Sequence, residues 1–354
     1  MKLIKVTLGS IATLVIAFLF FLGWSTINDY DPEPQITLSK QNAPALKKDT
    51  FSILIWNIGY AGLGDDMDFF YDGGEQMRTS KNRTDKNFRN ILKKLKKTPQ
   101  PDFLLLQEVD IDSKRSYHQH QVERIKSEIH SHNWYFTHNY LVDFVPMPLG
   151  NPLGKVESGI MSGSLHSPSS ATRYSYQGNF DWPKSVFMLD RCFLSLTYPL
   201  SSGDTLFIVN THNTAYDEGA LREKQMHQLK NWIKKRDNSQ NKIIVAGDWN
   251  QLPPEVKIDE FGTKPQSKKY SPKKIPQGFL PEGWQFIFDP HTPTNRGLDT
   301  FYHSNSYKTI IDFFAISPGI KPIEIKTTDL SFINSDHQPV YLKFTFVHQK
   351  QNTK

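Results

Sequence analysis

From residue 51 onward, apolar runs of strand length alternate with segments of helical periodicity. Continuous apolar runs are typical of strands buried on both faces of a sheet, whereas helices repeat apolar residues every three or four positions. Thr84 and Asp217 stand where N-caps of the first and last helical segments are expected. The pattern predicts strands at 51–56, 102–108, 134–140, 189–198, 205–211, 242–247, 309–317 and 340–346, and helices at 84–97, 117–130 and 217–236.

Two regions are less regular. Residues 145–183 are rich in Pro, Gly and Ser, which predicts short strands joined by long loops, and the Lys- and Pro-rich stretch 253–281 predicts a surface loop.

No Gly-rich phosphate loop follows a predicted strand, so the fingerprints of P-loop and Rossmann folds are missing. The remaining expectation is an α/β fold with mixed sheets covered by helices.

The N-terminus carries one long uncharged apolar run, residues 6–24. At about 1.5 Å per residue, this run is long enough to cross the hydrocarbon core of a bilayer. Lys2 and Lys5 precede it, which predicts a cytoplasmic N-terminus and an exported remainder, periplasmic or extracellular. A cleaved signal peptide is the alternative, although Gly23-Trp24-Ser25 is a poor cleavage site. We expect a single-pass membrane anchor at 1–24, a linker at 25–49, the main domain at 50–348 and a polar tail at 349–354.

Composition adds two constraints. The 354-residue chain has a formal net charge of +6, which suits a polyanionic partner such as nucleic acid or lipid head groups. The lysines are scattered, so an effect on solubility alone explains the charge equally well. The single cysteine, Cys192, excludes an intramolecular disulfide and a zinc–thiolate site, and its apolar neighbours indicate a position in the core.

Polar side chains recur at the ends of the predicted strands, where α/β folds usually place their ligands. Each has an ordinary structural explanation when it is taken alone: a turn residue, a solvated strand end or a structural histidine. Asp312 is harder to explain in that way, because a carboxylate inside an apolar strand needs a partner. The ordered set is what indicates a site: Asn57, Glu108, His212, Asp248, Asn250, Asp312, Asp336 and His337.

The chemistry of this set is specific. Hard oxygen ligands without thiolates suit Mg²⁺, with Mn²⁺ as a second choice, rather than zinc. A carboxylate beside histidine orients the ring and raises its basicity. Because no serine or cysteine nucleophile motif is evident, water is the expected nucleophile at a metal-bound phosphate.

The motifs WNIG, LLLQEVD, VNTHNTAYD, IVAGDWNQ, IIDFFAIS and SDHQPV resemble, in content and order, those of the endonuclease/exonuclease/phosphatase superfamily. The resemblance spans residues 51 to about 346, and GDWN and SDH are its most specific elements. It implies a four-layer α/β sandwich, with two mixed β-sheets face to face and helices outside. The segments SGIMSGS and NFDWPKSVFMLDRCF lie outside the shared pattern and are similar to a membrane-anchored bacterial branch.

The resemblance also implies a role for each site residue. Glu108 would be the principal magnesium ligand, with Asn57 nearby and Asp336 supporting the metal site. Asp248 would orient or deprotonate the attacking water, and Asn250 would bind the scissile phosphate. His337 would act with Asp312, and His212 would contact the phosphate or assist the leaving group. Some members carry an acidic residue two positions after the asparagine, where this chain has Gly59, so a metal contact from that position is in doubt.

Three functions compete. The expected one is a metal-dependent phosphodiesterase of the nuclease type, favoured by the basic balance. The second is a phospholipid or sphingomyelin phosphodiesterase, or a phosphoinositide phosphatase. The anchor favours it, as does the apolar stretch 67–71, which either enters a head-group layer or forms a packed loop. The third, a non-catalytic binding module, is disfavoured by the complete residue set. No obligate protein partner is evident.

Overall fold

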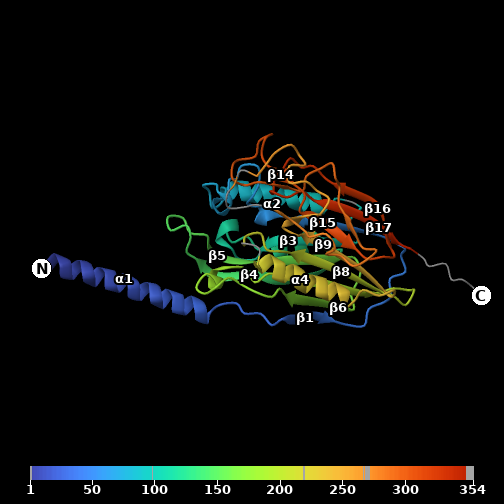
Figure 1. Cartoon of the computed structure of the whole chain (residues 1–354), viewed down its shortest axis with the longest axis horizontal. Helices are drawn as coiled ribbons and strands as arrows, with labels where there is room; N and C mark the ends of the chain where they lie inside the picture. The colour runs from blue at the N-terminus through green and yellow to red at the C-terminus, as the bar shows by residue number, and fades with distance from the viewer. Residues whose placement is uncertain (1, 98, 218–219, 266, 268–271, 348–354) are drawn as a thin grey trace, which may run out of the picture.

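The computed structural model describes residues 2–97, 99–217, 220–265, 267 and 272–347, so the predicted tail lies outside the described residues. Two large sheets pack face to face, and helices cover their outer faces (Figure 1). Each sheet is mixed, because β8–β9 in one and β2–β3 in the other are parallel pairs among antiparallel neighbours. The four-layer α/β sandwich predicted from the resemblance is confirmed.

The elements have the following bounds. The seven-stranded sheet runs in the order β1 (Gln35–Lys40), β6 (Ser170–Ser175), β7 (Cys192–Pro199), β8 (Thr205–His212), β9 (Asn241–Asp248), β15 (Asp312–Ile316), β12 (Gln285–Ile287). The six-stranded sheet runs β16 (Ile320–Thr327), β17 (Val340–Phe346), β2 (Thr50–Asn57), β3 (Phe103–Asp110), β5 (Gly154–Ser164), β4 (Asn133–Val145). The short pairs are β10 (Gln251–Leu252) with β11 (Lys273–Lys274), and β13 (Asn295–Arg296) with β14 (Lys308–Thr309). The helices are α1 (Lys2–Ile27), α2 (Lys81–Leu95), α3 (Gln121–Glu128) and α4 (Ala220–Lys234).

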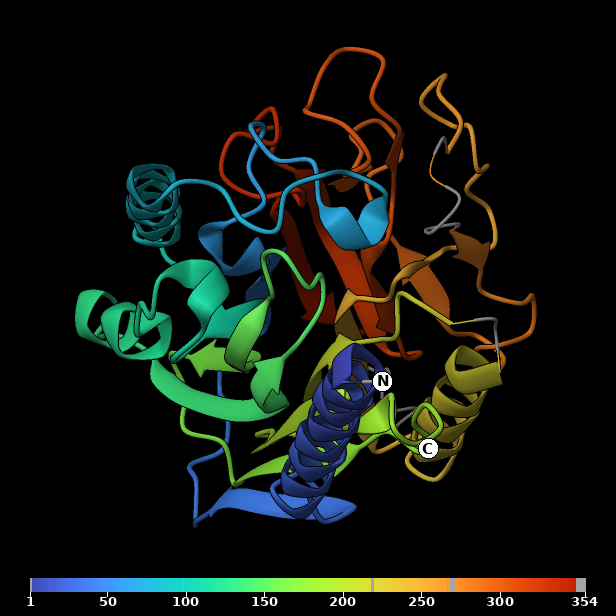
Figure 2. The ribbon, with the colours of Figure 1, turned by 90° about the vertical axis from the view of Figure 1, so that its left-hand side faces the viewer.

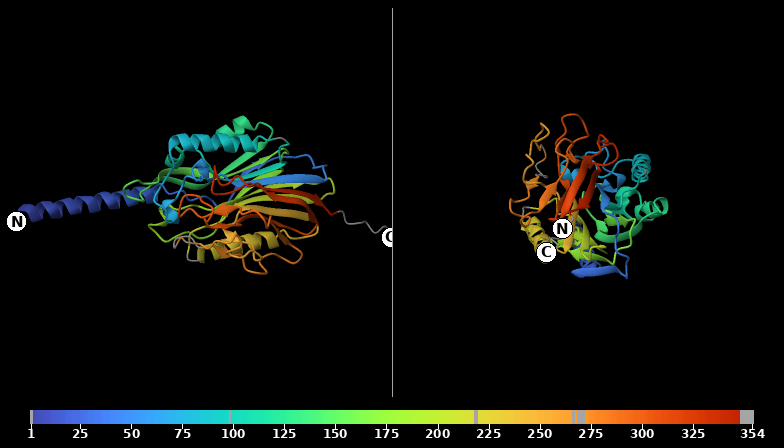
Figure 3. Two further views of the ribbon diagram at one scale, coloured as in Figure 1. Left: turned by 90° about the horizontal axis from the view of Figure 1, so that it is seen from above. Right: turned by 90° about the vertical axis from the view of Figure 1, so that its right-hand side faces the viewer.

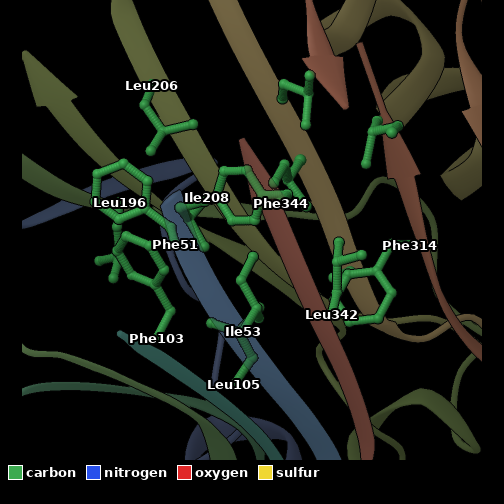
Figure 4. Packing of buried hydrophobic residues seen from close by; sticks show 14 of the residues in the cluster. Phe51, Ile53, Phe103, Leu105, Leu196, Leu206, Ile208, Phe314, Leu342 and Phe344 are labelled. Carbon is green, nitrogen blue, oxygen red and sulfur yellow. The ribbon is translucent and has the colours of Figure 1, made fainter. Parts of the chain in front are cut away.

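The two sheets bury one apolar layer between them (Figure 4). Alternation along β2 divides its side chains between two environments: Ile53 and Ile55 face the other sheet, whereas Leu54 and Trp56 face the helices. α2 and α3 pack on that outer side, and α4 packs on the outer side of β7, β8 and β9. Strands covered on both faces explain why β3 and β9 read as continuous apolar runs.

The predicted linker is wrong over part of its length. β1 pairs antiparallel with β6 and forms an edge of the seven-stranded sheet. Most of its side chains remain exposed, so no hydrophobic alternation marks the strand in the sequence. Its position is set by pairing with the backbone of β6, whose partner residues lie 130 to 139 positions further along the chain.

The irregular middle was also predicted wrongly. β5 has 11 residues and lies between β3 and β4, with Gly159 and Gly163 inside it. A Cβ at either glycine would come within 2.8 Å of an aromatic ring atom of β4, from Phe136 and Trp134 respectively. The rings that cover the strand thus require glycine at these positions. Because glycine is uncommon inside strands, the sequence does not indicate a long strand here.

Three smaller boundaries differ. α2 begins at Lys81, because Ser80 caps it by accepting a hydrogen bond from the Arg83 amide at 3.3 Å, and Thr84 lies inside the helix. α3 is shorter than predicted and begins at Gln121. Within the predicted surface loop 253–281, described residues are buried against the α4 side of the sheet, namely Val256, Ile275 and Phe279.

α1 extends away from the sandwich along its long axis (Figures 1 and 3). Residues Leu3–Ile27 form a helix long and apolar enough to cross a membrane, a property shared by membrane anchors and signal sequences. Within the described part of the chain, only Phe21, Leu22 and Ser25 among residues 3–27 are buried or half-buried. The helix therefore contacts the sandwich only near its own C-terminal end.

Candidate functional site

The predicted polar residues converge where the two sheets meet at one end of the sandwich. The parallel pairs bring the site residues together: Asn57, at the end of β2, lies beside Gln107 of β3, and His212 lies beside Asp248 at the ends of β8 and β9. Asn57 Nδ2 bridges the sheets by donating to Asp248 Oδ2 at 2.9 Å and to Glu108 Oε1 at 3.2 Å. The structure thus joins into one cluster the strand ends that the sequence analysis singled out.

Glu108 reaches this cluster through a β-bulge. The pairing of β3 with β5 shifts between Leu106 and Val109, and Glu108 has a left-handed backbone with φ of 54°. Asn210 of β8 provides hydrogen bonds where the bulge interrupts the pairing of β3 with β5. Its Nδ2 donates to Leu106 O at 3.2 Å, and its Oδ1 accepts from Gln107 Nε2 at 2.7 Å. Bulges re-aim side chains near active sites, and here the bulge turns Glu108 toward the opposite sheet.

Asp312 and His337 form a buried pair. Asp312 lies directly across from Asp248 in the register of β15 with β9, and its Oδ2 is 2.8 Å from His337 Nδ1. Burial alone would lower the pKa of His337, but the carboxylates of Asp312, Asp336 and Asp248 raise it well above its usual value. These carboxylates favour the protonated ring, and Nε2 lies 3.7 Å from both Asp248 Oδ2 and Asp336 Oδ2.

Asp248 is a third buried side chain, next to the Asp312–His337 pair. Burial raises its pKa to about 6, with Asp312 adding to the shift and His337 and the Asn57 amide opposing it. Its Oδ1 accepts the Asn250 backbone amide at 2.9 Å, and Asn250 adopts a left-handed conformation with φ of 50°. The Asn250 side chain in turn donates to Asn213 O at 2.8 Å. The GDWN motif is thus a tight turn closed on its own carboxylate.

His212 is the neutral histidine of the cluster. Its Nε2 lies 3.4 Å from Asp248 Oδ2, and its Nδ1 lies 3.5 Å from Asn139 Nδ2. Burial lowers its pKa well below the usual value, and the nearby cations Arg191, His337 and Arg115 add to this effect. The two histidines therefore differ in charge, because only His337 has a carboxylate in hydrogen-bond contact at 2.8 Å.

Two groups of residues have donors suited to a metal ion. Asp248, Asp312 and His337 present atoms within 4.8 Å of one another, but Asp312 Oδ2 and His337 Nδ1 are already paired. Glu108 and Asp336 form the better oxygen site. Burial raises the pKa of Asp336 to about 7, and the negative charge of the nearby Glu108 carboxylate adds to this shift. This donor set fits a hard divalent cation.

Asn57 and Gly59 refine the predicted metal site. Asn57 Oδ1 accepts a hydrogen bond from the Gly59 backbone amide at 2.9 Å. Asn57 therefore contacts Glu108 and Asp248 through its amide nitrogen. A Cβ at Gly59 would lie 2.9 Å from Asp336 Oδ1, and Gly59 has a φ of 49°. Glycine lets the backbone pass Asp336 closely, which leaves no room for an acidic side chain at this position.

The site opens into a cavity of about 340 Å³. Of the predicted residues, Glu108, His212, Asp248, Asn250, Asp336 and His337 line it, whereas Asn57 and Asp312 lie behind them. Much of the remaining wall is apolar or aromatic. Met67 and Phe69 are buried in the cluster that forms this wall, so the stretch 67–71 is a packed loop rather than a membrane-inserting one.

Sequence reasoning missed several residues of the cavity. Arg191 is 9% exposed and lines the cavity, and among the described residues its Nη1 has no hydrogen-bond partner. It immediately precedes β7, which runs antiparallel to β8 and therefore begins at the edge where β8 ends. Examining strand starts as well as strand ends would have found it. Asn139 and Asn295, which contact His212 and His337, come from strands whose sequence gives no comparable signal.

Comparisons with known proteins agree with this geometry. The model of the Endonuclease/Exonuclease/phosphatase family matches residues 54–337. No curated protein matches the chain. Among solved structures, an endonuclease/exonuclease/phosphatase from Beutenbergia cavernae is 16% identical with a TM-score of 0.56, covering 84% of this chain and 72% of that one.

Two further structures share the fold. ANGEL2, a 2′,3′-cyclic phosphatase, is 18% identical with a TM-score of 0.55, covering 87% of this chain and 98% of its own. The human Nocturnin catalytic domain is 16% identical with a TM-score of 0.52, covering 86% and 97%. At these identities the likeness establishes the fold, and the family match establishes the relationship. The chain therefore belongs to the Endonuclease/Exonuclease/phosphatase family, whose enzymes hydrolyse phosphoester bonds with the help of divalent metal ions.

Proposed function

We propose that the protein is a magnesium-dependent phosphodiesterase that uses water as its nucleophile. The observation that carries this proposal is the cross-sheet cluster, in which Glu108 and Asp336 line the same cavity as Asp248 and His337, and Asp312 holds His337 from behind. Glu108 and Asp336 would hold the metal, with Asn57 fixing Glu108. A bound divalent ion would neutralise phosphate oxygens and polarise the phosphorus atom.

The protein side chains supply the remaining chemistry. Asp248 has a pKa of about 6 and would accept the proton of the attacking water. The His337 imidazolium, fixed by Asp312, would donate from Nε2 to a phosphate oxygen as negative charge develops there. Asn250 would bind the same phosphate. His212, which is neutral, would contact the phosphate or assist the leaving group.

Arg191 is a further phosphate-binding residue in this proposal. Its buried guanidinium has an unused donor among the described residues, and the charges of Glu108 and Asp248 counter the lowering of its pKa by burial. Replacing Arg191 with lysine keeps the charge but loses the planar fork. We expect about a 10-fold lower kcat/KM for a soluble diester, and about 100-fold with Arg191→Ala. Arg89→Ala, on the far face of α2, should leave kcat/KM unchanged; equal rates for all variants would contradict the role.

The natural diester is a separate question. The overall positive charge favours nucleic acid, as the sequence analysis expected. The apolar and aromatic wall of the cavity favours a phosphoester attached to a lipid. Both classes share the phosphodiester that the cluster is proposed to hydrolyse.

The direct test measures hydrolysis of bis(4-nitrophenyl) phosphate by the full chain in detergent. We expect turnover with Mg²⁺, a loss of at least about 100-fold after EDTA treatment, and recovery on adding Mg²⁺ back. Turnover that survives EDTA would contradict metal dependence. Absence of turnover with either Mg²⁺ or Mn²⁺ would contradict the proposed activity.

A further inference from the structure

The end of α1 lies against the wall of the candidate catalytic cavity. The ring of Phe21 stacks on Phe187 with centroids 5.7 Å apart and meets Phe144 edge-on at 6.0 Å. Thr26 Oγ1 accepts a hydrogen bond from Trp182 Nε1 at 3.0 Å. Phe187 also lines the cavity, so the same side chain contacts the apolar helix and forms part of the cavity wall.

This contact fixes the level of a bilayer relative to the site. The uncharged run of residues 6–24 is about 28 Å long as a helix, close to the thickness of a hydrocarbon core of about 30 Å. Phe21 lies inside this run, near its end. When α1 spans a membrane, the side chains that touch Phe21 must therefore lie at the membrane boundary, and Phe187 brings the cavity wall to the same level.

The catalytic end of the sandwich faces this boundary. His337 lies just before β17, and β17 runs from the α1 end of the molecule toward the opposite end (Figures 1 and 3). Figure 2 looks along the molecule from the α1 side, and α1 projects toward the viewer beside the loops that join the strands at that end. The same end thus carries the apolar helix α1 and the reactive cluster.

Two segments that contact α1, through Phe144 and Trp182, carry exposed apolar side chains. We define the apolar rim as Phe144, Met147, Leu149 and Trp182, which are 39%, 46%, 83% and 60% exposed. Met147 also lines the cavity, and its carbonyl accepts a hydrogen bond from Tyr71 OH at 2.9 Å, which ties the rim to the cavity wall. Exposed apolar residues grouped beside a cavity indicate an interaction surface, and tryptophan is enriched at membrane interfaces.

The cations of the cavity suit one phosphate rather than a row of them. Arg115 is paired with Asp110 at 2.9 Å, and Arg296 donates to backbone carbonyls, including Met67 O at 3.1 Å. Arg191 has a donor without a partner among the described residues, and Lys184 lies near the rim. A nucleic-acid strand needs a basic track along its backbone, which these four residues do not form.

We propose that the cavity binds the phosphodiester head group of a lipid drawn from the bilayer that holds α1, with the apolar rim seated in the interface of that bilayer. The inference rests on the proposed phosphodiesterase function and assigns its substrate class. The water oxygen forms a bond to phosphorus, the bond from phosphorus to one alcohol oxygen breaks, and that alcohol leaves with a proton. A phosphomonoester and an alcohol are the products.

The first test measures the depth of the rim. Cys192 is buried, so a cysteine introduced at the surface can be labelled selectively with an environment-sensitive fluorophore. Leu149→Cys reports on the rim, and Ile323→Cys, exposed on β16 near the opposite end, is the matched control. In phosphatidylethanolamine/phosphatidylglycerol vesicles holding the full chain, quenchers on the lipid acyl chains should quench the Leu149 label strongly and the Ile323 label weakly. Equal, weak quenching of both labels would overturn the proposal.

The second test compares substrates. The full chain in these vesicles is assayed for release of phosphomonoester from the vesicle lipids, alongside bis(4-nitrophenyl) phosphate and a single-stranded oligonucleotide. We expect lipid hydrolysis that falls about tenfold in Leu149→Glu, because a charge at the interface weakens its seating, while hydrolysis of the soluble diester is unchanged. Ile323→Glu should change neither rate.

The outcomes separate the two levels of inference. Hydrolysis of the soluble diester or the oligonucleotide without hydrolysis of vesicle lipids would overturn the lipid assignment and leave the phosphodiesterase standing. A Leu149→Glu protein with the wild-type rate on vesicles would overturn the seating of the rim. Failure to hydrolyse any of the three substrates would overturn the phosphodiesterase function itself, and the lipid assignment with it.

Discussion

Replacing His337 with glutamine is expected to lower kcat for a soluble phosphodiester by about 10³-fold, with a much smaller change in KM. Three surrounding carboxylates raise the pKa of His337 well above its usual value, which favours the imidazolium, and its Nδ1 is fixed by Asp312 Oδ2 at 2.8 Å. Glutamine retains a donor but has no positive charge to offer when negative charge builds up on the phosphate. The loss should therefore appear in the transition state rather than in substrate binding.

Two further variants distinguish catalysis from folding. Asp312→Asn keeps the size of the carboxylate but removes the charge that holds the imidazolium, so we expect about a 100-fold loss of kcat. His227→Ala removes an exposed histidine of α4 and should leave kcat unchanged. Thermal unfolding measured for each variant reports whether the fold is retained. A folded His337→Gln enzyme with a nearly normal kcat would refute the assigned role.

The sequence predicted the core strands well because each of them is buried on at least one face. Five strands lie within a residue or two of their predicted bounds, namely β2, β3, β8, β9 and β17. Buried strands consist largely of apolar residues, and such runs can be recognised in the sequence. Four of these strands, β2, β3, β8 and β9, end at or near the site, so their last polar residues could be identified without knowing the sheet order. The prediction of a four-layer sandwich rested on the family resemblance, because the local pattern of apolar residues does not specify how strands assemble into sheets or which sheets pack together.

The rest depended on contacts between distant segments. β1 has mostly exposed side chains and is located by pairing with β6, and β5 carries glycines because the rings of β4 cover it. Arg191 enters the cavity from the start of a strand, and its role depends on which charges the fold places around it. The contact of Phe21 with Phe187 joins residues that no local pattern relates. Long-range pairing of this kind is invisible to periodicity.

The variant Glu108→Gln is expected to weaken Mg²⁺ binding by at least about 10-fold and to lower kcat by at least about 100-fold at saturating metal. Glu108 is 23% exposed at the cavity, and a β-bulge with a left-handed backbone turns it into the site, where its charge acts on Asp336. Glutamine preserves the side-chain volume and can still accept a hydrogen bond from Asn57. The change therefore removes one negative charge from the proposed metal site while leaving its shape intact.

Isothermal titration calorimetry with Mg²⁺ measures this binding directly and needs no substrate. Glu157→Gln is the matched control, because Glu157 is an acid of similar exposure, 21%, on β5, and its side chain pairs with His138 at 3.2 Å rather than with the cluster. The control should bind Mg²⁺ as the wild type does. If Glu108→Gln retained wild-type affinity while Asp248→Asn lost it, the metal would belong to the Asp248–Asp312–His337 group, whose donor atoms also lie within 4.8 Å of one another. The roles of the two acidic groups would then be exchanged, with Glu108 left to act on the water or the substrate.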